Sequence, residues 1–391
     1  MVEPWLAIIG LSEDGAAGLA DASRAALDQA EIVFGGPRHL ALVGAGARGQ
    51  EWPVPFSVAP VLACRGRQVA VLASGDPFWH GAGGSLVDHL GHGEWRAFPA
   101  PSTFQLTAAR LGWRMEEITC HGLHAAPFAR LRPVLSKGAR AICLLRDGAA
   151  PGALAEWLVS QGLAADLVVM EALGGPNERI RAATVPGFDL ADIAAPVAVA
   201  VTVTAGKGLP RAAGLDDGLF AHDGQITKRP VRALTLSALA PRGGELLWDI
   251  GAGSGSISVE WCLAGGRALA FELRADRAVN IRENAERFGI AHRMTVLEGP
   301  AAERQAGPAP DAVFFGGGGN AALIAQLWQM LPEGTRLVAN GVTLETESLL
   351  ASEQAARGGS LLRIDLAQAA PLGRMRGWEA ARPVVQWSVT R

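Results

Sequence analysis

The segment LLWDIGAGSGS, residues 246–256, runs from an apolar stretch directly into a glycine-rich turn. We expect the apolar stretch to form a buried parallel strand and the residues after the turn to begin a helix. Glycine adopts positive φ easily and lets a ligand approach the backbone, and the first N–H groups of a helix are free to bind a ligand. The spacing of Gly251, Gly253 and Gly255 therefore predicts a Rossmann-like nucleotide site.

Two cofactor classes compete for this loop. A dinucleotide fingerprint requires glycine or alanine at its sixth position, where this chain has Ser256. Asp249, two residues before the first glycine, would also lie close to an anionic pyrophosphate, which is unfavourable. The same carboxylate can help to hold the cationic methionine portion of S-adenosylmethionine, so we expect that cofactor in preference to NAD. The residues expected to bind it are Asp249, Gly251, Ala252, Gly253, Ser254 and Gly255.

A second acidic residue, Glu272, ends the next apolar stretch, residues 268–271, and follows Gly251 by 21 positions. A carboxylate at this place can accept hydrogen bonds from ribose hydroxyls. This feature fits both cofactors, so it indicates a nucleoside without choosing between them.

Two later strand ends complete the expected site in this half. Residues 298–301 follow the third strand, where Gly299 and Ala301 would flank an adenine, although an ordinary turn explains them equally well. Residues 316–319 are four glycines at the end of the fourth strand. Open α/β sheets bind ligands at this edge, so we expect Gly316 and Gly317 in a substrate loop.

The first half carries a different set of turn residues. The sequence SGDP, residues 74–77, follows an apolar stretch and predicts a rigid turn with exposed backbone donors. Residues 101–103 open a helix, where capping alone can explain the hydroxyl side chains. We expect these turns and the end of the first strand to form a second cofactor site. Its residues are Gly10, Ser74, Gly75, Asp76, Pro77, Ser102 and Thr103.

Acid and base groups are harder to assign. His39, His121 and His124 match neither zinc-ligand spacing nor a catalytic triad, and we interpret them as solvated or structural histidines. The four cysteines form no Cys-x-x-Cys pair, so we expect reduced thiols and no metal site. The sequence therefore assigns no catalytic residue.

The chain of 391 residues is long enough for two domains. Apolar stretches alternate with alanine-rich helical ones in both halves, which predicts α/β folds with parallel strands. Residues 206–224 contain glycine, proline and several charges with little periodicity, which is typical of a linker that leads into a new domain. We therefore expect domains at residues 1–211 and 212–391.

Composition excludes several classes of protein. The net charge of -3 lacks the basic footprint of a nucleic-acid-binding protein. We find neither an uninterrupted apolar stretch long enough for a membrane span nor a signal-peptide pattern. We therefore expect a cytoplasmic protein that binds neither nucleic acid nor a membrane.

Five segments of the first half together resemble the tetrapyrrole methylases of corrin biosynthesis, in particular the branch that acts on precorrin-6B. They are residues 9–10, 35–40, 74–77, 101–103 and 173–180. Three segments of the second half resemble the decarboxylating methyltransferases that act as partners of that branch. They are residues 225–232, 251–255 and 311–319.

The resemblance implies an N-terminal tetrapyrrole-methylase-type α/β domain and a C-terminal Rossmann-like class I methyltransferase domain. Each would bind its own S-adenosylmethionine. The first would methylate ring carbon 5 of precorrin-6B, and the second would methylate ring carbon 15 and remove carbon dioxide from the carbon-12 acetate. The resemblance also implies that Thr227 contacts the cofactor, that Lys228 and Arg232 bind the polycarboxylate substrate, and that the chain forms a homo-oligomer.

Two other functions remain open at this point. One is a methyltransferase for a different small molecule with a regulatory N-terminal domain, and the other is an NAD-dependent oxidoreductase. A non-catalytic binding module would not need two cofactor-type loops. The number of S-adenosylhomocysteine molecules that bind each chain would separate these functions.

Overall fold

The computed structural model describes residues 4–299, 307–316 and 319–391. The chain forms two compact units, which we describe separately. The first comprises Met1–Phe128 and Val134–Gly208, and the second comprises Ala129–Pro133 and Leu209–Arg391. None of the described helices is long and apolar enough to cross a membrane.

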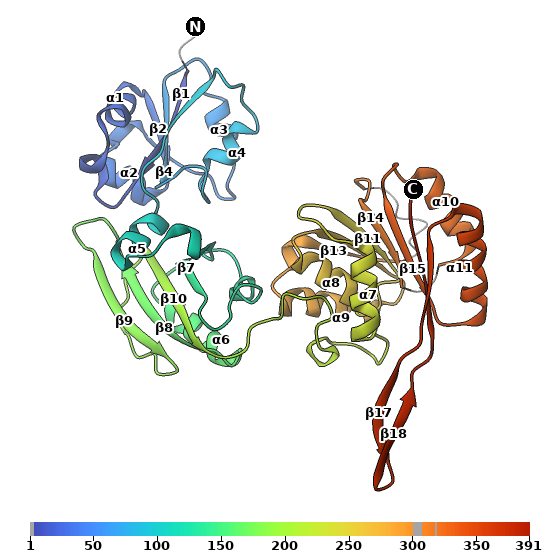
Figure 1. Ribbon diagram of the computed structural model, residues 1–391. Coiled ribbons are helices and arrows are strands. Elements are labelled where there is room, and N and C mark those ends of the chain that lie inside the picture. Colours follow the sequence, from blue (N-terminus) through green and yellow to red (C-terminus); the bar gives the residue numbers. More distant parts are fainter. Residues whose placement is uncertain (1–3, 300–306, 317–318) are drawn as a thin grey trace. The chain divides into compact units, whose positions relative to one another are not determined.

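The first unit begins with a parallel sheet that has helices on both faces (Figure 1). Its strands, in the order β3-β2-β4-β1-β5, are β1 (Leu6–Leu11), β2 (Ile32–Gly35), β3 (Gly49–Glu51), β4 (Val69–Ser74) and β5 (Trp95–Phe98). The helices are α1 (Asp21–Gln29) and α2 (Pro37–Val43) on one face, and α3 (Ala59–Leu62) and α4 (Gly83–Val87) on the other. Successive strand residues alternate between the faces, so Ile9 packs toward α1 whereas Ile8 packs toward α4.

The same unit contains a second, mixed sheet. Its strands, in the order β6-β7-β10-β8-β9, are β6 (Thr119–Gly122), β7 (Arg140–Leu145), β8 (Ala164–Glu171), β9 (Arg179–Val185) and β10 (Val197–Ala205). Only β6 and β7 are parallel, since β10 runs antiparallel to β7 and β8, and β8 runs antiparallel to β9. Our expectation of parallel strands is wrong here, because an apolar stretch reports burial and not strand direction. Helices α5 (Thr103–Leu111) and α6 (Ala150–Ser160) pack against this sheet.

The second unit contains one seven-stranded sheet. Its strands, in the order β13-β12-β11-β14-β15-β19-β16, are β11 (Leu246–Ile250), β12 (Arg267–Glu272), β13 (Met294–Glu298), β14 (Ala312–Phe315), β15 (Arg336–Gly341), β16 (Ser360–Ile364) and β19 (Val384–Thr390). The first five are parallel, whereas β19 runs antiparallel between β15 and β16.

Two layers of helices cover this sheet. They are α7 (Arg229–Leu239), α8 (Ser256–Leu263) and α9 (Ala275–Arg287) on one face, and α10 (Ala321–Met330) and α11 (Leu344–Arg357) on the other. The strand order reverses between β11 and β14. At such a switch point the neighbouring loops diverge and open a crevice for ligands. The glycine-rich loop of residues 251–255 follows β11, so the fold places it at this crevice.

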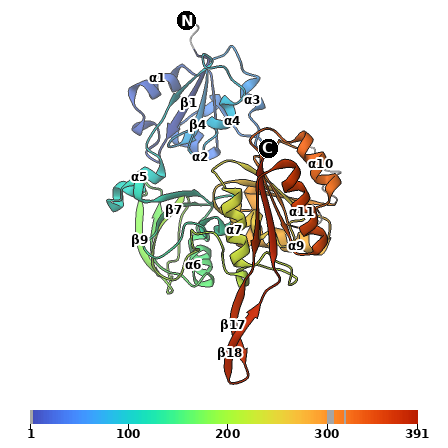
Figure 2. The same cartoon turned by 45° about the vertical axis from the view of Figure 1, so that its right-hand side comes forward.

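Between β16 and β19 the chain forms a separate two-stranded hairpin. Its strands are β17 (Ala367–Leu372) and β18 (Met375–Ala380). Figures 1 and 2 show the hairpin extending beyond the sheet of its own unit. Leu372, Met375 and Trp378 are 69%, 78% and 79% exposed, so the hairpin presents large apolar side chains to solvent.

Candidate active sites

The loop after β11 owes its shape to three glycines with positive φ. The φ angles of Gly251, Gly253 and Gly255 are 71°, 60° and 70°, a region that residues with a side chain rarely adopt. Gly255 is also the residue that precedes the first turn of α8. A Cβ atom on Gly253 would meet no described atom closer than the carbonyl oxygen of Gln225, at 3.9 Å. The space above Gly253 is therefore open to a ligand.

The backbone donors of this loop bind other parts of the protein. The N–H groups of Gly251 and Ala252 both donate to the carbonyl oxygen of Phe271, at 3.0 Å and 3.0 Å. The N–H of Gly253 donates to a carboxylate oxygen of Glu272, at 2.8 Å. The carbonyl oxygen of Ser254 accepts a hydrogen bond from the Asn284 side chain, at 2.9 Å. The loop therefore gives a ligand room and a fixed surface, while its N–H groups hold it against β12 and its Ser254 carbonyl oxygen binds α9.

Glu272 holds the loop in place. Its second carboxylate oxygen accepts the N–H of Arg274, at 3.0 Å, and the residue is 5% exposed. A carboxylate oxygen can accept more than one hydrogen bond, so the expected contact with ribose hydroxyls stays a prediction.

Asp249 lies beneath the loop. It is 1% exposed, and its Oδ2 accepts a hydrogen bond from the Ser258 hydroxyl on α8, at 2.6 Å. Its Oδ1 is enclosed and has no hydrogen-bond partner among the described residues. Burial raises the pKa of Asp249 to about 7, and the charge of Glu272 acts in the same direction. A direct contact between this carboxylate and the methionine portion of a cofactor stays a prediction.

The loops after the next strands meet the same edge of the sheet. The N–H of Gly299 donates to the carbonyl oxygen of Glu272, at 2.9 Å. A Cβ atom on Gly316 would lie 3.1 Å from the carbonyl oxygen of Gly251, so the loops after β11 and β14 adjoin. Ala301 and Gly317 lie outside the described residues.

Arg232 does not bind substrate, and this part of our prediction is wrong. Its side chain is fully buried and forms ion pairs with Glu260 and, at 3.0 Å, with Asp217. Its remaining donors bind the carbonyl oxygens of Leu215 and Thr227. The buried partner Glu260 lies on α8, 28 residues further along the chain, so no local sequence pattern predicts its ion pair with Arg232.

The roles that we predicted for Thr227 and Lys228, two residues near Arg232, stay predictions. Arg232 fixes the backbone of Thr227, and the Gln225 carbonyl just before it faces Gly253. The side chain of Lys228 is 61% exposed and lies 3.9 Å from Asp217, so its ammonium is accessible to a substrate carboxylate.

The predicted turn residues of the first unit pack closely against one another. A Cβ atom on Gly10 would clash with the carbonyl oxygen of Gly75, and one on Gly75 would lie 2.5 Å from Cα of Ser102. Ser102 forms a capping box with Gln105, with bonds of 2.7 Å and 3.3 Å, so capping does account for its hydroxyl. These residues join the ends of β1 and β4 to the start of α5.

Asp76 and Pro77 have structural contacts in this loop. A carboxylate oxygen of Asp76 accepts the N–H of Phe78, at 2.8 Å, which closes a local turn. Pro77 is buried, and a Cβ atom on Gly83 would clash with its carbonyl group. Their expected contacts with a cofactor stay predictions.

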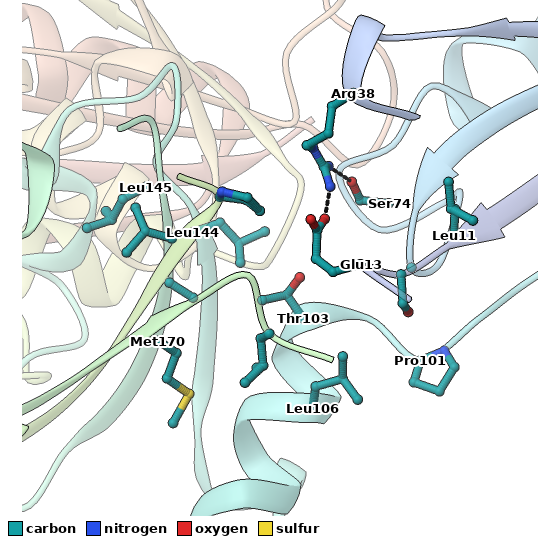
Figure 3. A pocket seen from close by; sticks show the side chains of 16 residues that line it. Leu11, Glu13, Arg38, Ser74, Pro101, Thr103, Leu106, Leu144, Leu145 and Met170 are labelled. Carbon is teal, nitrogen blue, oxygen red and sulfur yellow. Dashed lines mark hydrogen bonds and ion pairs between the residues drawn. The ribbon is translucent and has the colours of Figure 1, made fainter. Parts of the chain in front are cut away.

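Two adjoining cavities of the first unit lie beside these turns. The inner cavity, of about 130 Å³, is mostly apolar (Figure 3). Its lining includes Leu11, Glu13, Arg38, Ser74, Gly75, Thr103, Leu106, Leu144, Leu145, Met170 and Val197. The outer cavity, of about 390 Å³, is richer in histidine and aromatic side chains, and its lining includes His39, Trp52, Trp79, His80, Phe104 and His124. A third cavity of about 320 Å³ includes Gly10 and shares Ser12, Pro101 and Leu106 with the inner one.

Arg38, Ser74, Thr103, Leu144 and Leu145 line both the inner and the outer cavity. Arg38 forms an ion pair with Glu13 and donates to the Ser74 hydroxyl at 3.1 Å (Figure 3). The Nε2 atom of His39 lies 2.9 Å from Arg38 and 2.9 Å from the Ser74 hydroxyl. Burial, together with the charge of Arg38, lowers the pKa of His39 to about 4. His39 is therefore a neutral imidazole at physiological pH.

Two family models match the two parts of the chain, and a known protein matches the whole of it. The family of tetrapyrrole (corrin/porphyrin) methylases matches residues 6–189, and the precorrin methyltransferase domain matches residues 218–391. The precorrin-6Y C(5,15)-methyltransferase (decarboxylating) of Sinorhizobium sp is 48% identical over 403 residues, which cover 100% of this chain and 97% of that protein. The chain belongs to the precorrin-6Y C(5,15)-methyltransferase (decarboxylating) family.

Two shorter proteins each match a part of this chain. The probable cobalt-precorrin-6B C(15)-methyltransferase (decarboxylating) of Saccharolobus solfataricus is 36% identical over 34% of this chain and 71% of its own length. The cobalt-precorrin-7 C(5)-methyltransferase of Salmonella typhimurium is 31% identical over 45% of this chain and 88% of its own length. The expected pair of methyltransferase folds is confirmed, and an NAD-dependent oxidoreductase has no support.

Our sequence analysis did not place a histidine beside the cavities of the first unit. We interpreted His39 as solvated or structural, and the structure shows it in the lining of the outer cavity, in contact with Ser74 and Arg38. A signal was present, since His39 belongs to the segment 35–40 that carries the family resemblance. Glu13 gave no such signal, because its partner Arg38 lies on a different element.

Proposed function

We propose that this chain methylates precorrin-6Y at ring carbons 5 and 15 and removes one carboxyl group as carbon dioxide. We take precorrin-6Y to be the same tetrapyrrole as precorrin-6B. The observation that carries the proposal is that each unit has a cofactor-type site of its own. In the first unit the site is a set of cavities, and in the second it is a glycine loop at a switch point.

We assign ring carbon 5 to the first unit, and ring carbon 15 with the decarboxylation to the second. The two family models support separate methyltransferases at residues 6–189 and 218–391. Relatives named for carbon 15 with decarboxylation and for carbon 5 each match less than half of this chain. Proteins named for each activity alone thus resemble parts of this chain, which supports the assignment.

S-adenosylmethionine supplies an electrophilic methyl group when it is bound. In the first unit, the apolar walls of the inner cavity suit a nucleoside and exclude water from it. Arg38 and Ser74 stand where that cavity meets the outer one, so they mark the place at which donor and ring carbon come together. Methyl transfer depends mainly on this alignment.

In the second unit, the open surface of Gly253 provides the place for the donor. Asp249 and Glu272 put acidic groups beneath and beside it, which favours a cationic sulfonium. Lys228 offers an exposed ammonium for a substrate carboxylate. Loss of carbon dioxide leaves an electron pair on a carbon that is conjugated with the ring, and this makes the ring a better nucleophile for the methyl group.

Separate expression of the two units tests the assignment. We use residues 1–208 and 209–391, because the N–H groups of Gly214 and Leu215 donate to the buried Glu260 carboxylate and belong with the second unit. A cooperative melting transition checks that each fragment folds. With precorrin-6Y and S-adenosylmethionine, fragment 209–391 should add one methyl group and lose carbon dioxide, as mass spectrometry measures. Release of carbon dioxide by fragment 1–208 alone would overturn the assignment.

We also propose that the enzyme is a cytoplasmic homo-oligomer. Its four cysteines are free thiols, as is usual in reducing compartments. The hairpin of β17 and β18 exposes Leu372, Met375 and Trp378, and exposed apolar clusters mark interfaces between proteins. Light scattering should report a multiple of the chain mass for the wild type and a smaller mass for Trp378→Glu. A wild-type chain that is monomeric at micromolar concentration would refute the proposal.

A further inference from the structure

Methylation at a ring carbon leaves a proton to be removed. This inference rests on the proposed function of the first unit. The new carbon–carbon bond forms as the methyl–sulfur bond breaks, and the electrons of that bond stay on sulfur. The methylated carbon 5 still carries its hydrogen, and the ring system has gained one positive charge. The hydrogen must leave as a proton to restore the conjugation, so a group near carbon 5 has to accept it.

The structure limits where that group can be. The reacting carbon must reach the donor, so it lies where the inner and the outer cavity meet. Among the residues that the structure describes, three polar ones line both cavities: Arg38, Ser74 and Thr103. The guanidinium of Arg38 cannot accept a proton. Ser74 differs from Thr103 because its hydroxyl lies 2.9 Å from the Nε2 atom of His39.

The contacts of His39 define which of its nitrogens is free of a proton. Arg38 donates hydrogen bonds and cannot accept them, and its guanidinium lies 2.9 Å from Nε2 of His39. The Nε2 atom must therefore present a lone pair, and the ring proton belongs on Nδ1. The same Nε2 atom faces the Ser74 hydroxyl, so the pair is arranged for a proton to pass from oxygen to nitrogen.

We propose that Ser74 and His39 form a proton relay for methylation at ring carbon 5. The Ser74 hydroxyl accepts the proton from the methylated carbon as its own proton passes to Nε2 of His39. The ring then becomes neutral and His39 becomes an imidazolium. The net reaction converts the sulfonium donor to a neutral thioether and releases one proton, so charge and atoms balance.

The charges around His39 favour rapid release of that proton. Arg38 on α2 faces the imidazole and disfavours its cationic form, while Glu13 from the loop after β1 neutralises part of the Arg38 charge. Ser74 at the end of β4 contributes no charge. The low pKa of His39 keeps its Nε2 atom free of a proton at neutral pH. The relay is thus ready at the start of each turnover, and the methylated ring is acidic enough to protonate even a weak base.

Variants of the full chain test the relay. His39→Gly removes the imidazole, and His39→Asn keeps a polar side chain that cannot accept a proton. His89, which is exposed on the same unit and lines neither cavity, provides His89→Asn as the matched control. General bases contribute about 10²- to 10⁴-fold, so we expect both His39 variants to methylate carbon 5 at least about 100-fold more slowly. Their main product should carry one methyl group and lack one carboxyl group, whereas the control should form the doubly methylated product.

Two further measurements separate proton transfer from a structural role. Added imidazole should restore carbon-5 methylation by His39→Gly, since the outer cavity has room for it. A substrate with deuterium at carbon 5 should react more slowly than the protonated one in His39→Asn, because proton loss has become rate-limiting. Loss of methylation without imidazole rescue and without an isotope effect would refute the relay, as would wild-type rates in both His39 variants. Failure of the proposed function is distinguishable, because the wild type itself would then not add two methyl groups.

Discussion

The cofactor site of the second unit is formed by residues adjacent in the sequence, whereas that of the first unit is formed by residues far apart in it. In the second unit, one short loop of consecutive residues, 251–255, provides the open surface, and neighbouring strand ends hold it. In the first unit, the inner cavity is lined by residues from both sheets, among them Leu11, Leu145, Met170 and Val197. A local loop is stiff because its own backbone is bonded to β12, whereas a cavity between two sheets depends on how those sheets pack. The comparison predicts that a single change in the loop disables the second site, whereas the first site tolerates single changes in its walls better, except at the closely packed glycines Gly10 and Gly75.

The largest expected effect comes from Gly253→Val. A valine would be strained at φ +60° and would fill the space above the loop. We expect carbon-15 methylation and decarboxylation to disappear while carbon-5 methylation continues. Calorimetry should count one bound S-adenosylhomocysteine per chain where the wild type binds two.

Gly244→Val is the matched control for that experiment. Gly244 also has a positive φ, of 83°, and no described atom lies within 4 Å of its Cβ position. It therefore carries the same kind of backbone strain away from the loop. If Gly244→Val abolished the activity equally, strain and not occupied space would be the cause.

Arg232→Met should unfold the second unit at much lower urea concentration. It leaves the Glu260 carboxylate buried without its ion pair, and breaking such a pair costs about 3–5 kcal/mol. The double variant with Glu260→Gln should recover part of that loss, because the uncompensated charge is then gone. Unchanged stability combined with weaker substrate binding would restore the substrate role that we rejected for Arg232.

Asp249→Asn should change how the stability of the second unit depends on pH. The folded-state pKa of Asp249 is about 7, above its ordinary value of 3.8. The folded state therefore binds the extra proton, and the stability contributed by Asp249 is lost as the pH rises from about 4 to about 7. Relative to the wild type, the variant should gain about 2–4 kcal/mol at pH 8 and little at pH 4.

His39 predicts the opposite trend for the first unit. Its folded-state pKa of about 4 lies below the ordinary 6.5, so stability is lost as the pH falls through this range. Urea titrations of the two fragments at several pH values, each with and without its substitution, measure both trends. If the difference in unfolding free energy between the wild-type second unit and its Asp249→Asn variant does not change with pH, the raised pKa is contradicted.

The smallest expected effect is that of Glu272→Gln. The amide can no longer accept hydrogen bonds at both positions, so its bonds to the loop and to a ribose weaken by about 1–2 kcal/mol. Titration with S-adenosylhomocysteine should show about tenfold weaker binding at one site. The site of the first unit is the internal control and should keep its affinity. Full affinity at both sites would mean that the ribose lies elsewhere.

The contrast between a local loop and a cavity between two sheets also explains how far the sequence predicts each site. The loop after β11 could be located from adjacent residues, because its glycines specify the backbone shape and the strand before it specifies its place. The walls of the inner cavity could not be located in this way, since Leu11, Met170 and Val197 are ordinary core residues until the two sheets bring them together. The burial of Arg232 and the contacts of His39 also depend on partners far along the chain. Alternation of strands and helices predicted the α/β class, but it carried no information on the antiparallel direction of β8 and β10.

The position of β19 has a consequence for how the protein is made. Residues 384–390 lie between β15 and β16 inside the sheet, and Trp387 is fully buried there. During synthesis the first unit can fold while the ribosome is still adding the second. The second unit has to wait for one of its interior strands until nearly the whole of it has been translated. Until then the edges of β15 and β16 are unpaired, and such edges are where newly made chains aggregate or meet chaperones.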